Sequence, residues 1–137
     1  YEPGEVKVVV KKGGKVWATA VRRTAGPAVR LEATADRTAL RGLQDLAYVA
    51  LALRDARGTV VPEADVELVF EAGGAVELIG VCNGDPTDWT GFQAGRQKTF
   101  HGLCQAVLRV REGRRGAGWL TARGGGLDAR LSFEVRD

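Results

Sequence analysis

Side chains that could carry out catalysis are scarce in this 137-residue sequence, which has one histidine (His101), one serine (Ser132) and two cysteines. A Ser-His-Asp triad would need both Ser132 and His101. Ser132 lies within LDARLSFEV, which lacks the strand-to-helix turn that exposes such a nucleophile. One histidine and two distant cysteines do not supply the closely spaced ligands of a catalytic zinc ion, and no GxxxxGK[ST] loop is present to hold phosphates. We therefore predict that this chain is not itself an enzyme and holds no metal or cofactor.

The segment 80–102, GVCNGDPTDWTGFQAGRQKTFHG, combines aromatic rings with carboxylate, amide and guanidinium groups. Rings can stack on the apolar face of a sugar while polar groups bind its hydroxyls. An alternative is that the two rings anchor a long loop against the end of their own domain or pack on a neighbouring domain. The candidates for carbohydrate or interdomain contact are Asn83, Asp85, Asp88, Trp89, Phe92 and Arg96.

Two cysteines, Cys82 and Cys104, lie near the ends of the same segment. If Leu78 and Ala106 face the core, strict alternation along the flanking strands turns both thiols inward as well. Cys82 follows Leu78 by four residues, and Cys104 precedes Ala106 by two. That placement suits a disulfide and suits two buried free thiols equally well. A disulfide would favour a secreted parent protein, periplasmic or extracellular, but the sequence itself assigns no compartment.

Alternation of apolar and polar residues with period two predicts the elements that position these side chains. About nine short strands, separated by turns with Gly, Asp and Pro, predict an all-β fold: an antiparallel, immunoglobulin-like β-sandwich with Greek-key connections. The first two strands flank Gly13-Gly14 and form a hairpin, and 37–46 is the one stretch with room for a turn of helix. The predicted strands are 5–12, 15–23, 29–35, 47–55, 66–72, 75–82, 99–110, 116–123 and 127–135.

The charge distribution argues against nucleic acid as a partner, although the net charge is +3. Residues 1–27 carry six basic and two acidic side chains, whereas the rest carries fourteen basic and fifteen acidic ones. Nucleic-acid-binding domains concentrate positive charge far more strongly. No run approaches the roughly 18 consecutive apolar residues of a membrane span. We expect neither nucleic acid nor a membrane as partner.

The turn after the strand 47–55 begins at Asp55 and continues through Gly58 to Pro62, which breaks the sheet edge. An aspartate before a Gly-containing turn typically accepts hydrogen bonds from the backbone two residues on. We interpret Asp55 as the acceptor of such an Asx turn rather than as a ligand for a metal or a sugar.

These motifs resemble the C-terminal β-sandwich domain of glycoside hydrolase family 2 enzymes, chiefly bacterial β-galactosidases. That domain typically shows a Gly-x-Gly-Asn-Gly-Asp-Pro loop, then an aromatic residue, and then Phe-Asn-Gly-Leu at the start of a strand. Here three positions depart from the pattern, since cysteines replace small residues and histidine replaces the asparagine. The matching residues are Asn83, Gly84, Asp85, Pro86, Phe100, Gly102 and Leu103, with Asp36, Leu40, Asp55, Gly58 and Pro62 upstream; Cys82, His101 and Cys104 are the departures.

The first 26 residues resemble the tail of the domain that precedes the sandwich in such enzymes. The resemblance therefore implies two parts: a β-hairpin over 1–26 and an immunoglobulin-like sandwich over 27–137. The residues that carry this match are Tyr1, Pro3, Gly4, Gly14, Lys15, Thr24, Ala25 and Gly26.

The resemblance implies a non-catalytic accessory domain of a retaining, β-galactosidase-like enzyme. Retaining glycosidases need two carboxylates about 5–5.5 Å apart, and in this family both lie on a central barrel that this chain is too short to contain. The expected partners are the other domains of the parent, on which this domain would pack to support the catalytic core. The alternative is a carbohydrate-binding module that uses the 83–96 loop to bind a β-galactoside or a polysaccharide.

Overall fold

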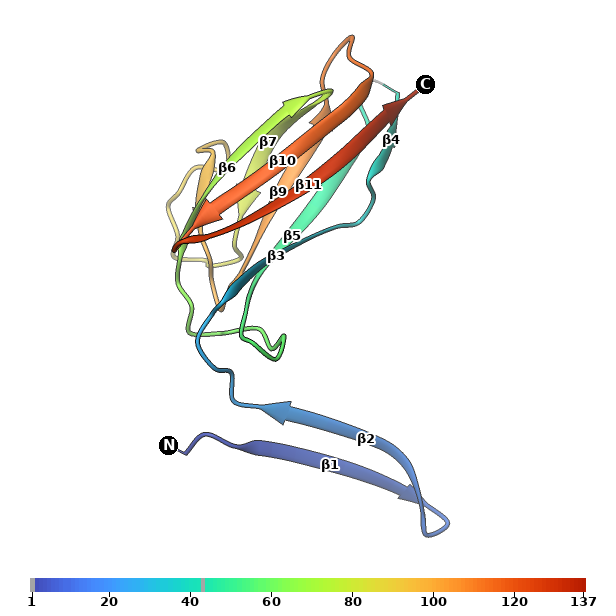
Figure 1. Cartoon of the computed structure of the whole chain (residues 1–137), viewed down its shortest axis with the longest axis vertical. Helices are drawn as coiled ribbons and strands as arrows, with labels where there is room; N and C mark the ends of the chain where they lie inside the picture. Colours follow the sequence, from blue (N-terminus) through green and yellow to red (C-terminus); the bar gives the residue numbers. More distant parts are fainter. Residues whose placement is uncertain (1, 43) are drawn as a thin grey trace.

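The computed structural model describes residues 2–42 and 44–137, so Leu43 and Tyr1, which carries part of the resemblance, lie outside the described residues. The described residues form strands and turns without a helix (Figure 1). Consequently they contain no helix that could cross a membrane. The strands are β1 (Glu5–Lys12), β2 (Lys15–Arg23), β3 (Arg30–Ala35), β4 (Ala39–Arg41), β5 (Leu46–Arg54), β6 (Glu67–Gly74), β7 (Val76–Cys82), β8 (Arg96–Lys98), β9 (Leu103–Val110), β10 (Gly116–Gly124) and β11 (Leu127–Arg136).

Strands β3 to β11 form two sheets that pack face to face. One has the order β4-β11-β10-β6-β8 and the other β3-β5-β9-β7. Three strands separate β5 from β9 along the chain, and three separate β6 from β10, yet the members of each pair are hydrogen-bonded neighbours. Such crossovers between sheets are Greek-key connections. The predicted all-β, immunoglobulin-like sandwich is confirmed.

The core lies between the two sheets and is built by alternate residues of each strand. Strand β11 shows the pattern most clearly, because its polar side chains face solvent while Phe133 and Val135 are buried. The other three apolar residues of β11 are partly buried against the core, as expected: Leu127, Ala129 and Leu131.

The sequence analysis missed two short strands, β4 and β8. The 37–46 segment holds no helix in its described residues; Ala39–Arg41 instead pair in parallel with the end of β11 and bury Leu40 completely. β8 is equally short and pairs with β6. Strands of three residues show too little alternation to be recognised by period alone.

The strand predicted over 99–110 begins at Leu103, because a tight turn precedes it. In this turn the Phe100 amide donates to the Leu103 carbonyl, and the Leu103 amide donates to the Phe100 carbonyl. His101 and Gly102 both have positive φ, 51° and 76°. Asparagine and histidine tolerate this region better than most side chains do. This explains physically why histidine can stand where the family pattern has asparagine.

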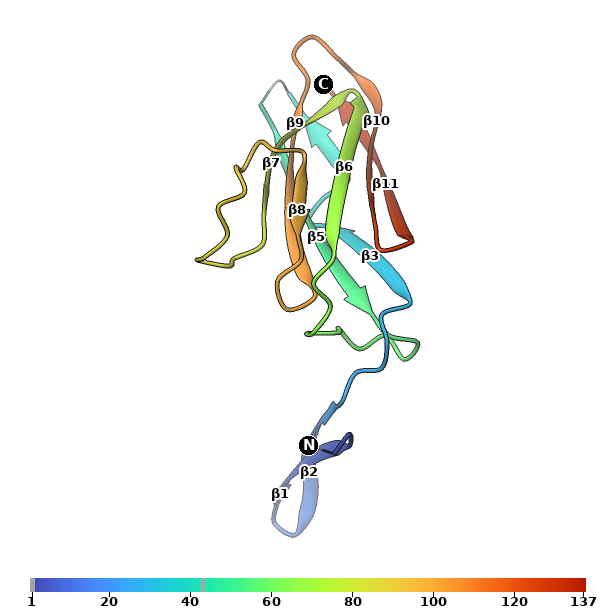
Figure 2. The ribbon, with the colours of Figure 1, turned by 90° about the vertical axis from the view of Figure 1, so that its left-hand side faces the viewer.

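The β1–β2 hairpin stands apart from the sandwich, as Figures 1 and 2 show from two directions. Every residue of β1 is exposed. The antiparallel register places Val8 and Val10 opposite Ala20 and Ala18, so one face of the hairpin is apolar and uncovered. A two-stranded hairpin is at best marginally stable alone, so this face is suited to a covering partner.

Candidate functional site

The candidate site is the 83–95 loop, which leaves β7, extends sideways from the sandwich and returns as β8 (Figure 2). Sequence reasoning singled out six residues in and beside it. The structure brings Asn83, Asp85 and Asp88 together in one hydrogen-bonded network. Arg96 lies instead on β8, exposed to solvent and paired with Val69 of β6.

Asp88 is the centre of this network. Its Oδ2 accepts hydrogen bonds from Asn83 Nδ2 at 2.7 Å and from Gln97 Nε2 at 2.5 Å, and its Oδ1 accepts one from the Thr90 amide at 2.8 Å. The Thr90 amide is the main cause that lowers the pKa of Asp88, and the Thr90, Asn83 and Gln97 side chains add to it. Asp88 is therefore a carboxylate whose two oxygens are already engaged within its own loop.

Asn83 and Asp85 fix the start of the loop. Asn83 Nδ2 also donates to the Lys98 carbonyl at 2.9 Å, and Asn83 Oδ1 accepts from the Asp85 amide at 2.9 Å. Asp85 Oδ1 in turn accepts from the amide of Thr87 at 2.8 Å and from its hydroxyl at 2.7 Å. These hydrogen bonds stabilise the loop and engage the Asn83 side chain and one oxygen of Asp85 within it.

Sequence reasoning missed Gln97, which joins this network by donating from β8 to Asp88. Its side chain is only 2% exposed, and it points inward from a three-residue strand. The polar residue on a short, polar stretch gave no period-two signal from which its burial could be inferred.

The two rings of the loop are largely exposed to solvent. Trp89 is 97% exposed and Phe92 is 72% exposed, so they do not anchor the loop against its own domain. The backbone beneath them is held, because the Phe92 carbonyl accepts a hydrogen bond from the Val81 amide at 2.7 Å. The loop thus exposes two large apolar side chains on a hydrogen-bonded backbone.

An open hollow of about 500 Å³ lies between the loop and the end of β7. Trp89, Phe92, Asp85 and Asp88 line it, together with Gln97, and Arg96 does not. The hollow therefore lacks the guanidinium group that the sequence analysis placed beside the rings.

The two cysteines are free thiols in the structure. The β7–β9 register shifts at Ile79, which is the extra residue of a β-bulge. Beyond the bulge Val81 turns inward and Cys82 outward, opposite Gln105. The two thiols thus do not share the inner face, because strict alternation fails at one residue. Cys104 alone is buried.

Alkylation should distinguish the two thiols. Burial, with a smaller contribution from Cys82, raises the pKa of Cys104 to about 12, and the thiolate is the reactive form. We expect iodoacetamide at pH 8 to modify Cys82 in the folded chain, and Cys104 only after denaturant is added. Peptide mass spectrometry reads out both sites. If neither cysteine can be alkylated, before or after denaturant is added, the assignment of two free thiols is wrong.

The described residues contain no group of three or more His, Cys, Asp or Glu side chains that could hold a metal ion. The two-sheet topology defines an immunoglobulin-like β-sandwich module, and its internally bonded 83–95 loop carries two exposed rings. The chain belongs to the family described as glycoside hydrolase family 2 C-terminal domain 5, whose sequence profile matches residues 31–131.

Individual relatives agree with this assignment. The chain is 35% identical over 128 residues to Beta-galactosidase BoGH2A of Bacteroides ovatus, a match that covers 93% of this chain and 15% of that protein. A glycosyl hydrolase family 2 member from Bacteroides cellulosilyticus superposes with a TM-score of 0.94 at 28% identity, over 100% of this chain and 18% of the other. A beta-glycosidase from Bacteroides vulgatus gives a TM-score of 0.89 at 29% identity, over 98% and 18%. The chain thus spans less than a fifth of each relative.

Proposed function

We propose that this domain is a non-catalytic accessory part of a larger, β-galactosidase-like retaining glycosidase, and that it supports the catalytic core by packing on neighbouring domains. The match to 15% of BoGH2A and 18% of two family 2 structures supports a longer parent. The hydrogen bonding of the loop carboxylates supports the non-catalytic role. Asp85 and Asp88 are bonded within the loop, whereas a retaining mechanism needs a pair of carboxylates that face one sugar.

The exposure of Trp89 and Phe92 carries this proposal. Isolated apolar residues on a surface are ordinary, but two large rings that are both mostly exposed on one loop are suited to contact another surface. The network around Asp88 holds the loop before any partner arrives, so little conformational entropy is lost on docking. Buried tryptophans are also among the residues that contribute most to protein interfaces.

We further propose that the hairpin of residues 1–26 belongs to the preceding domain of the parent and that the sandwich begins at residue 27. The uncovered apolar face of β1 and β2 supports this division. The family profile likewise begins at residue 31, inside β3 and beyond the hairpin.

A carbohydrate-binding module is the second candidate, because exposed rings are also what a sugar would stack on. The hydrogen bonds around Asn83, Asp85 and Asp88 weigh against it, since sugar hydroxyls would have to compete for groups that are already bonded. Arg96, the remaining polar candidate, does not line the hollow.

Trp89→Ala separates these roles in the isolated chain. Because the ring touches little of its own domain, we expect the free energy of unfolding to change by about 0.5 kcal/mol or less. We also expect no saturable change in tryptophan fluorescence with galactose, lactose or β-linked polysaccharides, in wild type or variant. Trp17→Ala, which removes another exposed ring from the hairpin, is the matched control. A saturable response lost only in Trp89→Ala would instead establish the carbohydrate-binding role.

A further inference from the structure

We propose that Asp55 is the positioning residue of a rigid joint between the hairpin and the sandwich: its carboxylate fastens the connecting segment 25–28 to the turn that follows β5. This role is independent of the 83–95 loop and goes beyond the Asx turn expected from the sequence. It would set the direction in which whatever precedes the sandwich is held.

The joint lies where backbone pairing is interrupted. The hairpin ladder ends at Gly4 and Thr24, where the Thr24 amide donates to the Gly4 carbonyl at 2.9 Å. Pairing with the sandwich resumes where the Val29 amide donates to the Arg54 carbonyl at 2.9 Å. Residues 25–28 therefore connect the two parts without taking part in either ladder, so the angle between the parts depends on what holds this segment.

Asp55 reaches this segment with one oxygen and its own turn with the other. Oδ2 accepts the Gly26 amide at 2.9 Å, while Oδ1 accepts the amides of Arg57 at 2.9 Å and Thr59 at 2.8 Å. The Asp55 amide also donates to the Thr59 carbonyl at 2.9 Å. The residue is only 4% exposed. The turn thus fixes the carboxylate through Oδ1, and Oδ2 bonds to the connecting segment.

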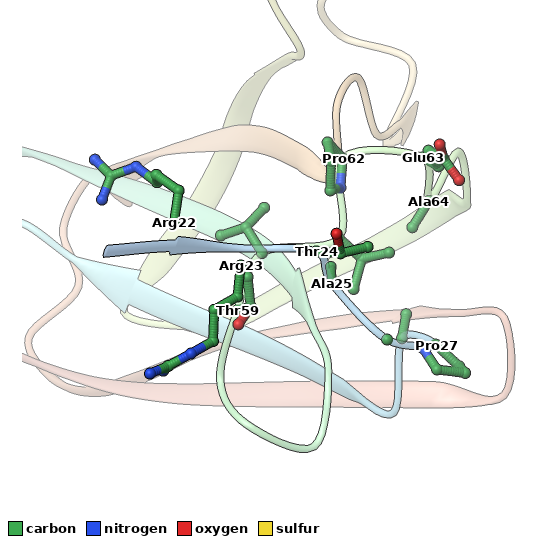
Figure 3. A pocket seen from close by; sticks show the side chains of 13 residues that line it. Arg22, Arg23, Thr24, Ala25, Pro27, Thr59, Pro62, Glu63 and Ala64 are labelled. Carbon is green, nitrogen blue, oxygen red and sulfur yellow. The ribbon is translucent and has the colours of Figure 1, made fainter. Parts of the chain in front are cut away.

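Ala28 packs against the sandwich core, but residues 25–27 lie beside open hollows, which makes the hydrogen bond to Gly26 more important. An open hollow of about 800 Å³ lies between the segment and the 59–64 turn, and in Figure 3 Thr24 and Ala25 are drawn between Thr59 and Pro62. A second hollow, of about 730 Å³, lies on the side of Val29 and Arg57. The Gly26 amide is also the main cause that lowers the pKa of Asp55, so the interaction favours the ionised carboxylate.

Asp55→Asn removes the hydrogen bond to the connecting segment and keeps the hydrogen bonds within the turn. The asparagine Oδ1 can still accept the amides of the turn, but its NH₂ group cannot accept the Gly26 amide. In the full 137-residue chain we expect the residual dipolar couplings of residues 5–23 to fit the alignment tensor of the sandwich in wild type. In Asp55→Asn they should fit a different, smaller tensor, and the Gly26 amide should exchange at least about tenfold faster, the factor that corresponds to about 1.4 kcal/mol.

The matched control is Asp36→Asn, which alters an aspartate that accepts the Tyr48 amide at 2.9 Å far from the joint; it should leave the hairpin tensor unchanged. Should Asp55→Asn fail to fold, Gly26→Pro removes the donor instead, with Gly26→Ala as its control because an added Cβ would meet nothing closer than 3.7 Å. Proline should uncouple the hairpin and alanine should not. A hairpin that keeps the sandwich tensor in Asp55→Asn or Gly26→Pro, or that tumbles independently already in wild type, overturns the proposal.

Discussion

Replacing Gly102 with alanine is expected to destabilise the sandwich by about 2–4 kcal/mol, which is large for a single methyl group. Gly102 has φ 76°, a conformation that costs an L-residue about 1–2 kcal/mol. An added Cβ would also lie 2.3 Å from the Val61 carbonyl oxygen. The backbone cannot move away freely, because the Gly102 carbonyl accepts the Leu53 amide at 2.8 Å. This residue belongs to the Phe-x-Gly-Leu motif, and the close approach gives that glycine a physical reason.

Gly84→Ala is the matched control, since Gly84 has φ 81° but an added Cβ there meets nothing within 4 Å. It should lose only the conformational contribution, about 1–2 kcal/mol. Denaturant unfolding of both variants measures the difference. Equal losses would show that the contact with Val61 does not restrict residue 102.

Leu51→Ala is expected to cost about 2–5 kcal/mol of unfolding free energy, the range for deleting a fully buried leucine side chain. Leu51 lies on β5, is completely buried, and has Ala33 and Cys104 opposite it on the two neighbouring strands. Because the interior between the sheets is close-packed, the cavity left by the truncation cannot be filled by its neighbours.

Leu103→Ala provides the comparison within the same sheet, because Leu103 is 44% exposed on the start of β9. Its loss should stay near 0.5 kcal/mol. A Leu51→Ala variant no less stable than Leu103→Ala would contradict the packing described between the two sheets.

The sandwich was predictable because most of its strands are long enough for alternation to appear. β11 shows why: its polar and apolar residues alternate over ten positions, from Leu127 to Arg136. β4 and β8, with three residues each, carry no such pattern. No residue type in the sequence marks the bulge at Ile79, so the outward orientation of Cys82 followed only from the observed register.

The candidate loop was predictable as a location, and its internal arrangement was not. Its unusual residue types marked it, and the turn preference of Asn83 and Asp85 was evident from the sequence. That Asp88 would bond to Gln97 depends on how the chain crosses from β7 to β8, which pairs with β6 in the opposite sheet. The exposure of Trp89 could not be distinguished from anchoring, since both uses place a ring on a long loop. Asp55 is similar, because its Asx turn was evident but its bond to Gly26, 29 residues away, was not.

The most direct test of interdomain docking compares hydroxyl-radical oxidation of Trp89 in the isolated chain and in the full-length glycosidase that carries this domain. In the isolated chain the ring is 97% exposed and should oxidise rapidly, with the half-buried Trp119 as an internal reference. We predict that Trp89 and Phe92 become strongly protected in the full-length enzyme and that Trp119 changes little. Equal oxidation of Trp89 in both proteins would contradict the proposal that this loop packs on a neighbouring domain.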